Sequence, residues 1–406
     1  MKILSDAADF MSGGTPNKAN PAFWGGDISW YSASNMTDRF IGNDSPKITY
    51  EGLIAGSKMA PKGSTLILVR GSGLFNYIPI CYVEKAVAFN QDVKAICPKD
   101  DTDPVFLHFW MESLRNTLNQ NLGVTGIGAG KLDTDFLKNL PFPDLSRKKQ
   151  EYIAQYAQSF DRKIDLNRRM NETLEAMARA LFRDWFVDLG PTRTKMAGEA
   201  PYLAPELWEL FPDRLDDEGK PEGWHIASID FLCRITSGKR PPNKETSPSD
   251  ENPIPVYGGN GISWFTKDIL FDQPFLITGR VGTLGTVFRV NEKCWVSDNA
   301  LCLFPKINSY FEYLYFIISG IDFQSLNSGS TQPLLTQSSL SSQECILPAE
   351  EIITIFHAQV SVWFEKQQQL EKESHTLAQL RDFMLPKLMS GEISIRDAEK
   401  MVENAA

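Results

Sequence analysis

The sequence has 406 residues, of which 42% are hydrophobic and 23% charged, and its formal net charge at pH 7 is −10; these values fit folded domains and exclude extensive disorder. No apolar run reaches the about 18 residues of a membrane-spanning helix and the N-terminus lacks a secretory signal, so we expect a cytoplasmic protein without membrane contact. The six cysteines form no CxxC pair and only four histidines are present, so we expect no metal site and no catalytic histidine set.

Residues 1–145 combine short apolar strands with glycine-rich turns. Thr65–Val69 is a β-rich run bounded by glycine, and Ser12–Pro16 reads as a turn. The segment ends at the proline-rich stretch Leu140–Pro143, which stops regular structure before a helix. We therefore predict a mixed α/β domain over residues 1–145.

Residues 146–187 carry apolar side chains at alternating spacings of four and three, from Ile153 to Trp185. This spacing is typical of a coiled-coil helix. Asn167 interrupts the stripe, and it either fixes the helix register from a buried position or faces solvent. The residues that we expect in the helix-pairing seam are Ile153, Phe160, Ile164, Asn167, Leu174 and Leu181.

Residues 188–223 form an acidic stretch rich in proline and glycine. Residues 187–223 carry 4 Lys+Arg against 9 Asp+Glu. This composition indicates a connector rather than a domain.

Residues 224–348 repeat the pattern of residues 1–145, which predicts a second mixed α/β domain. The matched strings are Ser12–Pro16 with Ser237–Pro241, Ile28–Trp30 with Ile262–Trp264, Leu68–Gly73 with Ile277–Gly282, and Phe89–Asp92 with Val296–Asn299. In this alignment Arg70 and Arg280 both end matched strands.

Residues 349–390 repeat the apolar stripe of the first helix at a constant offset of 203 positions, and residues 391–406 form a C-terminal tail. We therefore predict an α+β protein in which two duplicated mixed α/β domains are separated and joined by two long antiparallel coiled-coil helices, with pseudo-two-fold symmetry. The expected seam residues of the second helix are Phe356, Val360, Trp363, Leu370, Leu377 and Met384. Both helices carry apolar side chains outside the seam that we expect to be exposed, namely Tyr152, Tyr156, Met170, Met177, Phe182 and Phe364.

One glycine-rich string imitates a nucleotide-binding loop. Gly126–Lys131 is one residue short of the phosphate-loop spacing, and Leu132 stands where a hydroxyl would hold magnesium. We expect no nucleotide site and no catalytic residues in this chain.

The order and duplication of these motifs resemble a specificity (S) subunit of a Type I DNA restriction-modification system over essentially the whole length. Strings that fit the family also include Trp185–Asp188, Leu210–Asp213, Pro221–Trp224 and Leu388–Ile393. The resemblance implies a non-catalytic subunit whose two target-recognition domains each read one half of a bipartite, asymmetric site in double-stranded DNA. The helices would set the spacer between the half-sites.

The resemblance also implies partners. Two methyltransferase (M) subunits would carry S-adenosylmethionine, and two restriction (R) subunits would use ATP and Mg²⁺, whereas this chain would bind no cofactor. Contacts to phosphates and base edges need particular residue types, and we expect these types near glycine turns. The DNA-binding candidates are Lys18, Asn35, Arg70, Ser72, Lys131, Lys239, Arg240, Tyr257, Asn260, Arg280 and Thr331. An alternative is a coiled-coil scaffold whose duplicated domains bind proteins rather than DNA.

Overall fold

The computed structural model describes residues 2–43, 45–126, 128–282, 284–329 and 333–403. Its contacts divide the chain into two compact units: unit 1 contains residues 1–167 with 371–406, and unit 2 contains residues 168–370. Each unit therefore holds one repeat and one end of each long helix. The domain boundaries drawn from the sequence follow secondary structure instead of contacts and stay a prediction.

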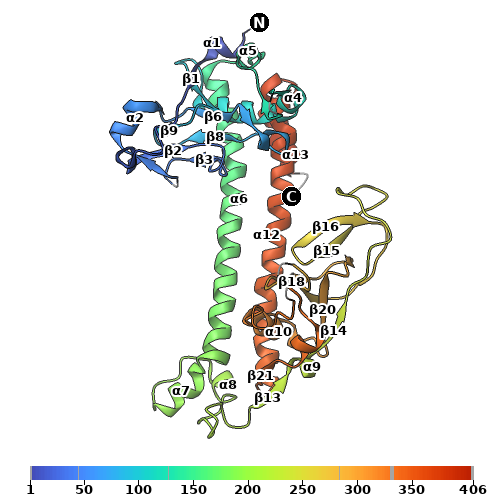
Figure 1. Ribbon diagram of the computed structural model, residues 1–406. Helices are drawn as coiled ribbons and strands as arrows, with labels where there is room; N and C mark the ends of the chain where they lie inside the picture. Colours follow the sequence, from blue (N-terminus) through green and yellow to red (C-terminus); the bar gives the residue numbers. More distant parts are fainter. Residues whose placement is uncertain (1, 44, 127, 283, 330–332, 404–406) are drawn as a thin grey trace. The chain divides into compact units, whose positions relative to one another are not determined.

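Both predicted long helices are present. Helix α6 (Arg147–Phe182) continues into the π-helical turn η3 (Arg183–Val187), and helix α12 spans Glu350–Ser390 (Figure 1). Helix α12 is followed directly by Gly391, whose φ of 79° is the left-handed conformation that commonly terminates helices. Leu189, just after η3, has a φ of 56° and is the one non-glycine residue with positive φ in the described part of the chain.

The two helices pair within unit 1 in antiparallel orientation. The side-chain amide of Asn167 donates to a carboxylate oxygen of Glu373 at 2.8 Å. Closer to the start of α6, Asp161 pairs with Arg381 of α12. As the residue number falls along α6, the number of its partner on α12 rises, so the two helices run in opposite directions. Asn167 is only 1% exposed, so the polar seam position lies buried between the helices.

The helices also pair in antiparallel orientation within unit 2. The amide of Gln367 donates to the backbone carbonyl oxygen of Asn171 at 2.7 Å. Further along, the rings of Phe182 and Phe356 have centroids 6.0 Å apart. An aromatic cluster therefore follows the polar pair in this unit.

None of the seam candidates is exposed. Those that are buried are Ile153, Phe160, Asn167, Phe356, Val360, Leu370 and Met384. Those that are half-buried are Ile164, Leu174, Leu181, Trp363 and Leu377.

Two aromatic residues expected to be exposed are buried instead. Phe182 stacks on Phe316 with a centroid distance of 5.0 Å, and Phe364 stacks on the same ring at 6.1 Å. Phe316 belongs to helix α10 (Tyr310–Ser319), whose aromatic face covers the helices in unit 2. A single sequence cannot separate this domain-facing side of a helix from an exposed side, because both are apolar.

Unit 1 is built on a five-stranded sheet in the order β1-β10-β6-β8-β3. Helix α3 packs across β6, β8 and β10, and the core continues from there to the ends of α6 and α12. A four-stranded sheet, β4-β2-β9-β5, and a small sheet, β11-β12-β7, complete the unit. The strands are β1 (Ala8–Ser12), β2 (Trp24–Tyr31), β3 (Phe40–Ile41), β4 (Lys47–Ile48), β5 (Lys58–Ala60), β6 (Thr65–Leu68), β7 (Arg70–Gly71), β8 (Ile80–Val83), β9 (Val87–Phe89), β10 (Val93–Pro98), β11 (Gly123–Val124) and β12 (Gly130–Lys131). The shorter helices are α1 (Leu4–Ala7), η1 (Pro21–Phe23), α2 (Tyr50–Gly56), η2 (Ser72–Phe75), α3 (Pro104–Ser113), α4 (Arg115–Gln120), α5 (Thr134–Lys138) and α13 (Ile395–Glu403).

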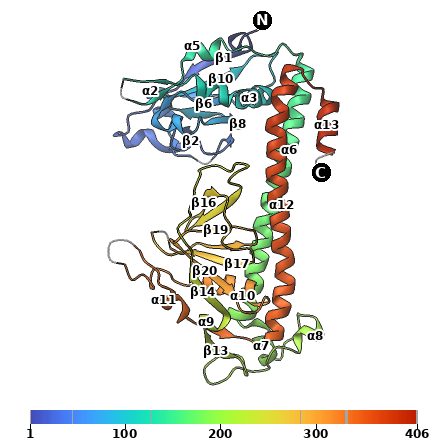
Figure 2. The same ribbon diagram turned by 90° about the vertical axis from the view of Figure 1, so that its right-hand side faces the viewer.

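Unit 2 is built on a four-stranded sheet in the order β14-β20-β17-β18. Helix α10 lies between this sheet and the long helices of the unit (Figure 2). A second sheet has the order β16-β15-β19, and β13 pairs with β21. The strands are β13 (His225–Ser228), β14 (Cys233–Ser237), β15 (Ile254–Gly258), β16 (Gly261–Thr266), β17 (Phe275–Gly279), β18 (Val287–Val290), β19 (Trp295–Val296), β20 (Ala300–Pro305) and β21 (Glu344–Leu347). The shorter helices are α7 (Gly190–Met196), α8 (Pro205–Trp208), α9 (Ile229–Leu232) and α11 (Gln337–Ser341).

The two repeats share one topology. The strands β1-β10-β6-β8 of unit 1 correspond to β14-β20-β17-β18 of unit 2, with antiparallel neighbours throughout. Ser12 ends β1 opposite Lys94, and Ser237 ends β14 opposite Leu301. This register aligns the two turns that the sequence matched.

One predicted correspondence is wrong. Strand β2 pairs in parallel with β9 through Tyr31 and Phe89, whereas in unit 2 it is β15 that pairs in parallel with β19, through Tyr257 and Val296. The counterpart of Ile28–Trp30 is therefore within β15, not the Ile262–Trp264 string on the neighbouring strand β16. The shared tryptophan was misleading, because it marks an aromatic strand but not its neighbours in a sheet.

The match between Arg70 and Arg280 is shifted by one residue. The backbone N–H of Val69 donates to Asp92 at 2.8 Å, and that of Arg280 donates to Asn299 at 2.8 Å. Arg280 thus occupies the place of Val69. Because successive residues of an extended chain point to opposite sides, the two arginines are not equivalent readers.

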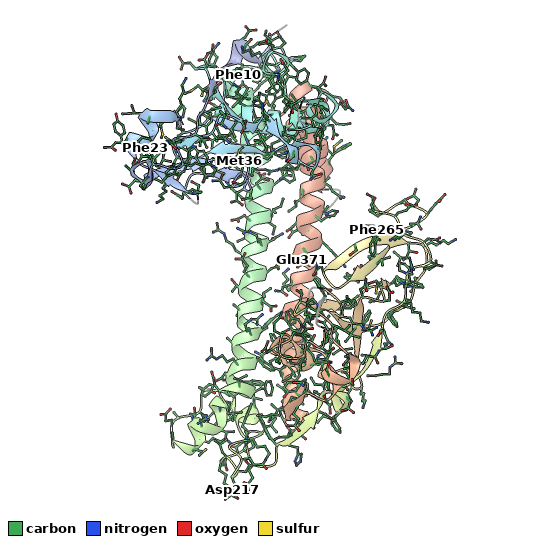
Figure 3. All side chains as sticks on the ribbon, in the orientation of Figure 1. Phe10, Phe23, Met36, Asp217, Phe265 and Glu371 are labelled. Carbon is green, nitrogen blue, oxygen red and sulfur yellow. The ribbon has the colours of Figure 1, made fainter. Side chains whose placement is uncertain are left out.

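The acidic connector folds onto unit 2. The ring of Phe211 lies 5.3 Å from that of Trp185, and Lys195 pairs with Asp213 at 2.9 Å. Asp217 lies at a turn of this segment (Figure 3). The connector is therefore part of the unit 2 core, although its composition is that of a loop.

Candidate nucleic-acid interface

Two backbone turns meet at the same place in each unit, and we call this arrangement the paired-turn site. It comprises residues 12–16 and 89–92 in unit 1, and residues 237–241 and 296–299 in unit 2. The backbone N–H of Gly14 donates to Phe89 at 2.9 Å, and that of Lys239 donates to Val296 at 2.8 Å. The same hydrogen bond thus closes both sites.

A glycine makes this close approach possible in both units. A Cβ atom on Gly13 would lie 2.1 Å from the carbonyl oxygen of Phe89, and one on Gly238 would lie 2.2 Å from that of Ser297. Neither position can accept a side chain unless the backbone moves. The glycine-rich turns found in the sequence are therefore explained by steric need.

A tryptophan caps the first turn in both units. The indole N–H of Trp30 donates to the carbonyl oxygen of Gly14 at 3.1 Å, and that of Trp295 donates to the carbonyl oxygen of Lys239 at 2.7 Å. Gly14 and Lys239 are corresponding residues, but the tryptophans come from different strands, β2 and β19. The two units thus fix the same turn with different parts of the sequence.

In unit 2 the paired-turn site opens into a polar cavity of about 430 Å³. The ammonium group of Lys244 lies 4.4 Å from the ring centroid of Trp264, a distance that allows a cation–π contact. Phe265, the next residue on the β15–β16 hairpin, is labelled in Figure 3. The residues lining the cavity are Arg240, Pro241, Pro242, Lys244, Trp264, Ser297, Asp298 and Asn299.

Cations gather around this cavity. Lys239, Arg240 and Lys244 are exposed, and none of them forms an ion pair in the part of the chain that the structure describes. The guanidinium group of Arg280 donates to the hydroxyl of Ser237 at 3.3 Å. The site therefore presents positive charge that no described carboxylate neutralises by direct contact.

A second cluster of cations lies beside the paired-turn site of unit 1. Arg70 and Lys131 are direct partners across strands β7 and β12. Lys94 donates to the hydroxyl of Ser12, and its pKa is lowered by partial burial and by the positive charges of Lys138 and Arg70. Burial is the larger cause of this lowered pKa, and repulsion by Lys138 and Arg70 adds to it. Such a group favours an anionic partner.

The remaining candidates differ in their exposure and in the hydrogen bonds that the structure records for their side chains. The side chain of Asn35 is used within its own loop, because it accepts from the Ser32 N–H at 2.7 Å and donates to the Trp30 carbonyl at 3.0 Å. The hydroxyl of Tyr257 donates to Glu292 at 2.6 Å, and burial raises its pKa. The exposed candidates are Lys18, Ser72 and Asn260. Thr331 lies outside the described residues.

Sequence reasoning missed three cations that the fold brings to these sites, namely Lys94, Lys138 and Lys244. Lys244 could have been found, because Lys239, Arg240 and Lys244 form the densest basic stretch of the second repeat. Lys94 and Lys138 are isolated in the sequence, and only the folding of β10 and α5 brings them near Arg70.

The structure gives no support to the nucleotide-loop imitation. Gly130–Lys131 is strand β12 of a hairpin with β11, not the entry to a helix that could bind phosphate. Ile127 in this string lies outside the described residues. The described residues contain no cluster of His, Cys, Asp or Glu that could hold a metal, and no helix among them is long and apolar enough to cross a membrane.

A family model described as the Type I restriction modification DNA specificity domain matches residues 1–176 and 221–375. The MjaIX Type I restriction enzyme specificity subunit of Methanocaldococcus jannaschii is 25% identical, over 98% of this chain and 94% of its own length. The HindI specificity subunit of Haemophilus influenzae is 27% identical, over 63% of this chain and 69% of its own length.

A solved structure has the same fold. The S subunit of a Type I restriction-modification system from M. genitalium gives a TM-score of 0.55 at 16% identity, with 95% of each chain covered. The fold is thus shared although few residues are identical.

Proposed function

This chain belongs to the Type I restriction-modification DNA specificity family and its role is the recognition of DNA sequence, and on that premise we propose that each unit reads one half of a bipartite, asymmetric site in double-stranded DNA. The observation that carries this proposal is the paired-turn site, which occurs once in each unit on the same backbone scaffold. The side chains around the two scaffolds differ, so two different half-sites would be read. The relatives' specificity role supports recognition instead of catalysis in this chain.

The net charge of −10 is compatible with DNA binding because positive charge is concentrated locally. Arg240 and Lys244 line the cavity of unit 2 and Lys239 directly precedes Arg240, while Arg70 and Lys94 belong to the cluster of unit 1. Phosphate contacts position a protein on DNA and base contacts specify the sequence, and cationic side chains can make both. Partner subunits that enclose the duplex would supply further phosphate contacts.

The partners that we propose are two methyltransferase subunits, which bring S-adenosylmethionine, and two restriction subunits, which use ATP and Mg²⁺. Exposed apolar side chains on the long helices would form part of a docking surface, because contiguous apolar patches mark contacts between proteins. They are Tyr152, Leu166 and Phe383 in unit 1, and Met170, Met177 and Val362 in unit 2. The helices would also set the spacing between the half-sites.

The proposed function is tested by sequencing the methylated motifs of the host with and without the gene for this chain. Loss of one bipartite motif is expected on deletion. Exchange of residues 1–145 for the corresponding domain of another family member should alter one half-site and leave the other intact.

Two results would contradict the proposal. If the exchange alters both half-sites or neither, the assignment of one half-site to each unit is wrong. If deletion leaves every motif in place while the chain binds other proteins, the alternative of a protein-binding scaffold is supported.

A further inference from the structure

We propose that three corresponding positions of the paired-turn sites determine which bases are read. This inference rests on the proposed function and names the side chains and the chemistry of recognition. The positions are Thr15, Gln91 and Asp92 in unit 1, and Arg240, Asp298 and Asn299 in unit 2.

Backbone hydrogen bonds establish the correspondence of the first turn. Gly14 and Lys239 make the same hydrogen bond to the second turn, at 2.9 and 2.8 Å. The next residues, Thr15 and Arg240, therefore stand at the same point of the scaffold.

The second turns of the two units are aligned by the hydrogen bond at their last residue. The carbonyl oxygens of Asp92 and Asn299 each accept from the backbone N–H that follows the adjacent strand, at 2.8 Å in both units. Gln91 and Asp298, one residue earlier, are consequently equivalent as well.

The backbone scaffold is the same in the two units, whereas the side chains at the three positions differ. The steric role of Gly13 is repeated by Gly238, and the serine that ends the first strand is repeated as well. The three proposed reading positions instead differ between the units. Thr15 is replaced by Arg240, the amide of Gln91 by the carboxylate of Asp298, and the carboxylate of Asp92 by the amide of Asn299. A protein that holds two readers in one geometry but reads two sequences needs its differences at positions that the scaffold does not fix. Thr15 and Asp92 are half-buried, and the other four positions are exposed.

In unit 1 the three side chains bind one another. The hydroxyl of Thr15 donates to Gln91 at 2.7 Å, and the amide of Gln91 donates to Asp92 at 3.3 Å. This chain of hydrogen bonds orients the amide of Gln91 at the exposed edge of the turn. An oriented amide is suited to the N6 and N7 atoms of adenine.

In unit 2 the three corresponding side chains face a cavity. Arg240, Asp298 and Asn299 are exposed and line the cavity of about 430 Å³. A guanidinium group binds the O6 and N7 atoms of guanine with two hydrogen bonds, and a carboxylate accepts from the N4 amino group of cytosine. Since Arg240 and Asp298 line one cavity, the geometry points to a G·C pair in the second half-site, with Lys239 and Lys244 on the flanking phosphates.

The test uses the whole complex of this chain with its methyltransferase subunits. Arg240→Lys keeps the charge but removes the two-pronged donor, and Arg240→Gln removes the charge as well. The matched control is Arg234→Gln, which changes an exposed arginine on β14 that lies over the ring of Phe304, away from the cavity. Binding to a library of randomised DNA duplexes and the motifs methylated in cells are measured for each variant.

We expect both Arg240 variants to lose about ten-fold or more of the discrimination for guanine at one position of the second half-site. The first half-site should stay unchanged, and Arg234→Gln should keep the whole motif. Gln91→Ala should relax one position of the first half-site only. Thermal unfolding of each complex shows that the variants are folded.

Three outcomes would overturn the inference. One is an unchanged motif in folded Arg240 and Gln91 variants. Another is retention of full guanine discrimination by Arg240→Lys together with uniformly weaker binding of Arg240→Gln to all sequences, which would make Arg240 a phosphate contact. The third is equal relaxation by Arg234→Gln. The proposed function fails separately, if the unaltered complex selects no bipartite motif at all.

Discussion

His108 is a buried histidine in the core of unit 1. Its side chain is 0% exposed, and its Nε2 atom lies 3.7 Å from a carboxylate oxygen of Glu112. Within the described structure neither ring nitrogen has a hydrogen-bond partner. The rings of Phe40, Tyr82 and Phe109 surround it with centroid distances of 5.5 to 5.9 Å. Burial, with the nearby charge of Arg39, lowers its pKa to about 3.

This lowered pKa predicts that unit 1 loses stability in mild acid. Between pH 6.5 and 3 the unfolded chain binds a proton at His108 that the folded chain does not bind, so the free energy of unfolding falls as the pH falls. The stabilisation is fully present above pH 6.5. The loss is about 1.4 kcal/mol per pH unit, or roughly 2 kcal/mol at pH 5. Urea unfolding at pH 7.5 and pH 5 measures it.

His108→Phe should remove this part of the pH dependence, because phenylalanine fits among the surrounding rings and does not titrate. The control is His375→Gln, which changes an exposed histidine on α12 and should leave the slope as it is. An equal slope in the wild type and His108→Phe would show that His108 does not cause the acid sensitivity.

At the scale of elements, the sequence predicted what depends on long periodic patterns. The two helices begin and end within one residue of the expected 146–187 and 349–390, because an apolar stripe repeated over many turns is a strong signal. The duplicated glycine turns were also found correctly, since a close backbone approach admits only glycine at Gly13 and Gly238.

The details that failed depend on contacts between distant segments. The register of β2, which carries Trp30, and of β17, which Arg280 follows, is set by neighbours such as β9 and β20. A shift of one residue changes the side to which a side chain points, and no local pattern reveals that shift. The cluster around Lys94 has the same origin, because its members are separated in the chain and are brought together by folding.

The buried amide of Asn167 leads to a prediction about the helix pair. Asn167→Ala removes its hydrogen bonds to Glu373 and Ser374, at 2.8 and 3.2 Å, and leaves their oxygens without this donor. We expect the free energy of unfolding of unit 1 to fall by about 1–2 kcal/mol. Arg162→Ala, at an exposed position of the same helix in unit 1, is the control and should change it by less than about 0.5 kcal/mol. Equal effects of both variants would show that the seam amide contributes nothing specific.

At the scale of the whole molecule, the proposed spacer role predicts the effect of lengthening both helices. Seven residues inserted after Asn167 in α6 and seven before Glu371 in α12 keep the seam pattern, because two turns of a coiled coil take seven residues. Each helix grows by about 10 Å, which corresponds to about three base pairs of DNA. We expect the methylated motif to keep both half-sites and to gain about three base pairs in its gap.

Affinity for the longer site should be lower than that of the wild type for its own site. Three base pairs turn the duplex by about 100°, whereas the heptad returns the helix face to nearly the same direction, so DNA twist must absorb the difference. Insertion in α6 alone is the control and should disrupt the seam and abolish methylation. A gap that stays fixed in the double insertion would show that the helices do not set it.

The backbone origin of the paired-turn site bears on how such a protein acquires new targets over generations. Its geometry depends on hydrogen bonds of the main chain and on Gly13 and Gly238, not on the exposed side chains. Substitutions at exposed positions usually change the folding free energy by less than about 0.5 kcal/mol. A lineage can therefore exchange a base preference by single mutations while every intermediate still folds, and after duplication the two copies are free to diverge at those positions while the glycines stay fixed.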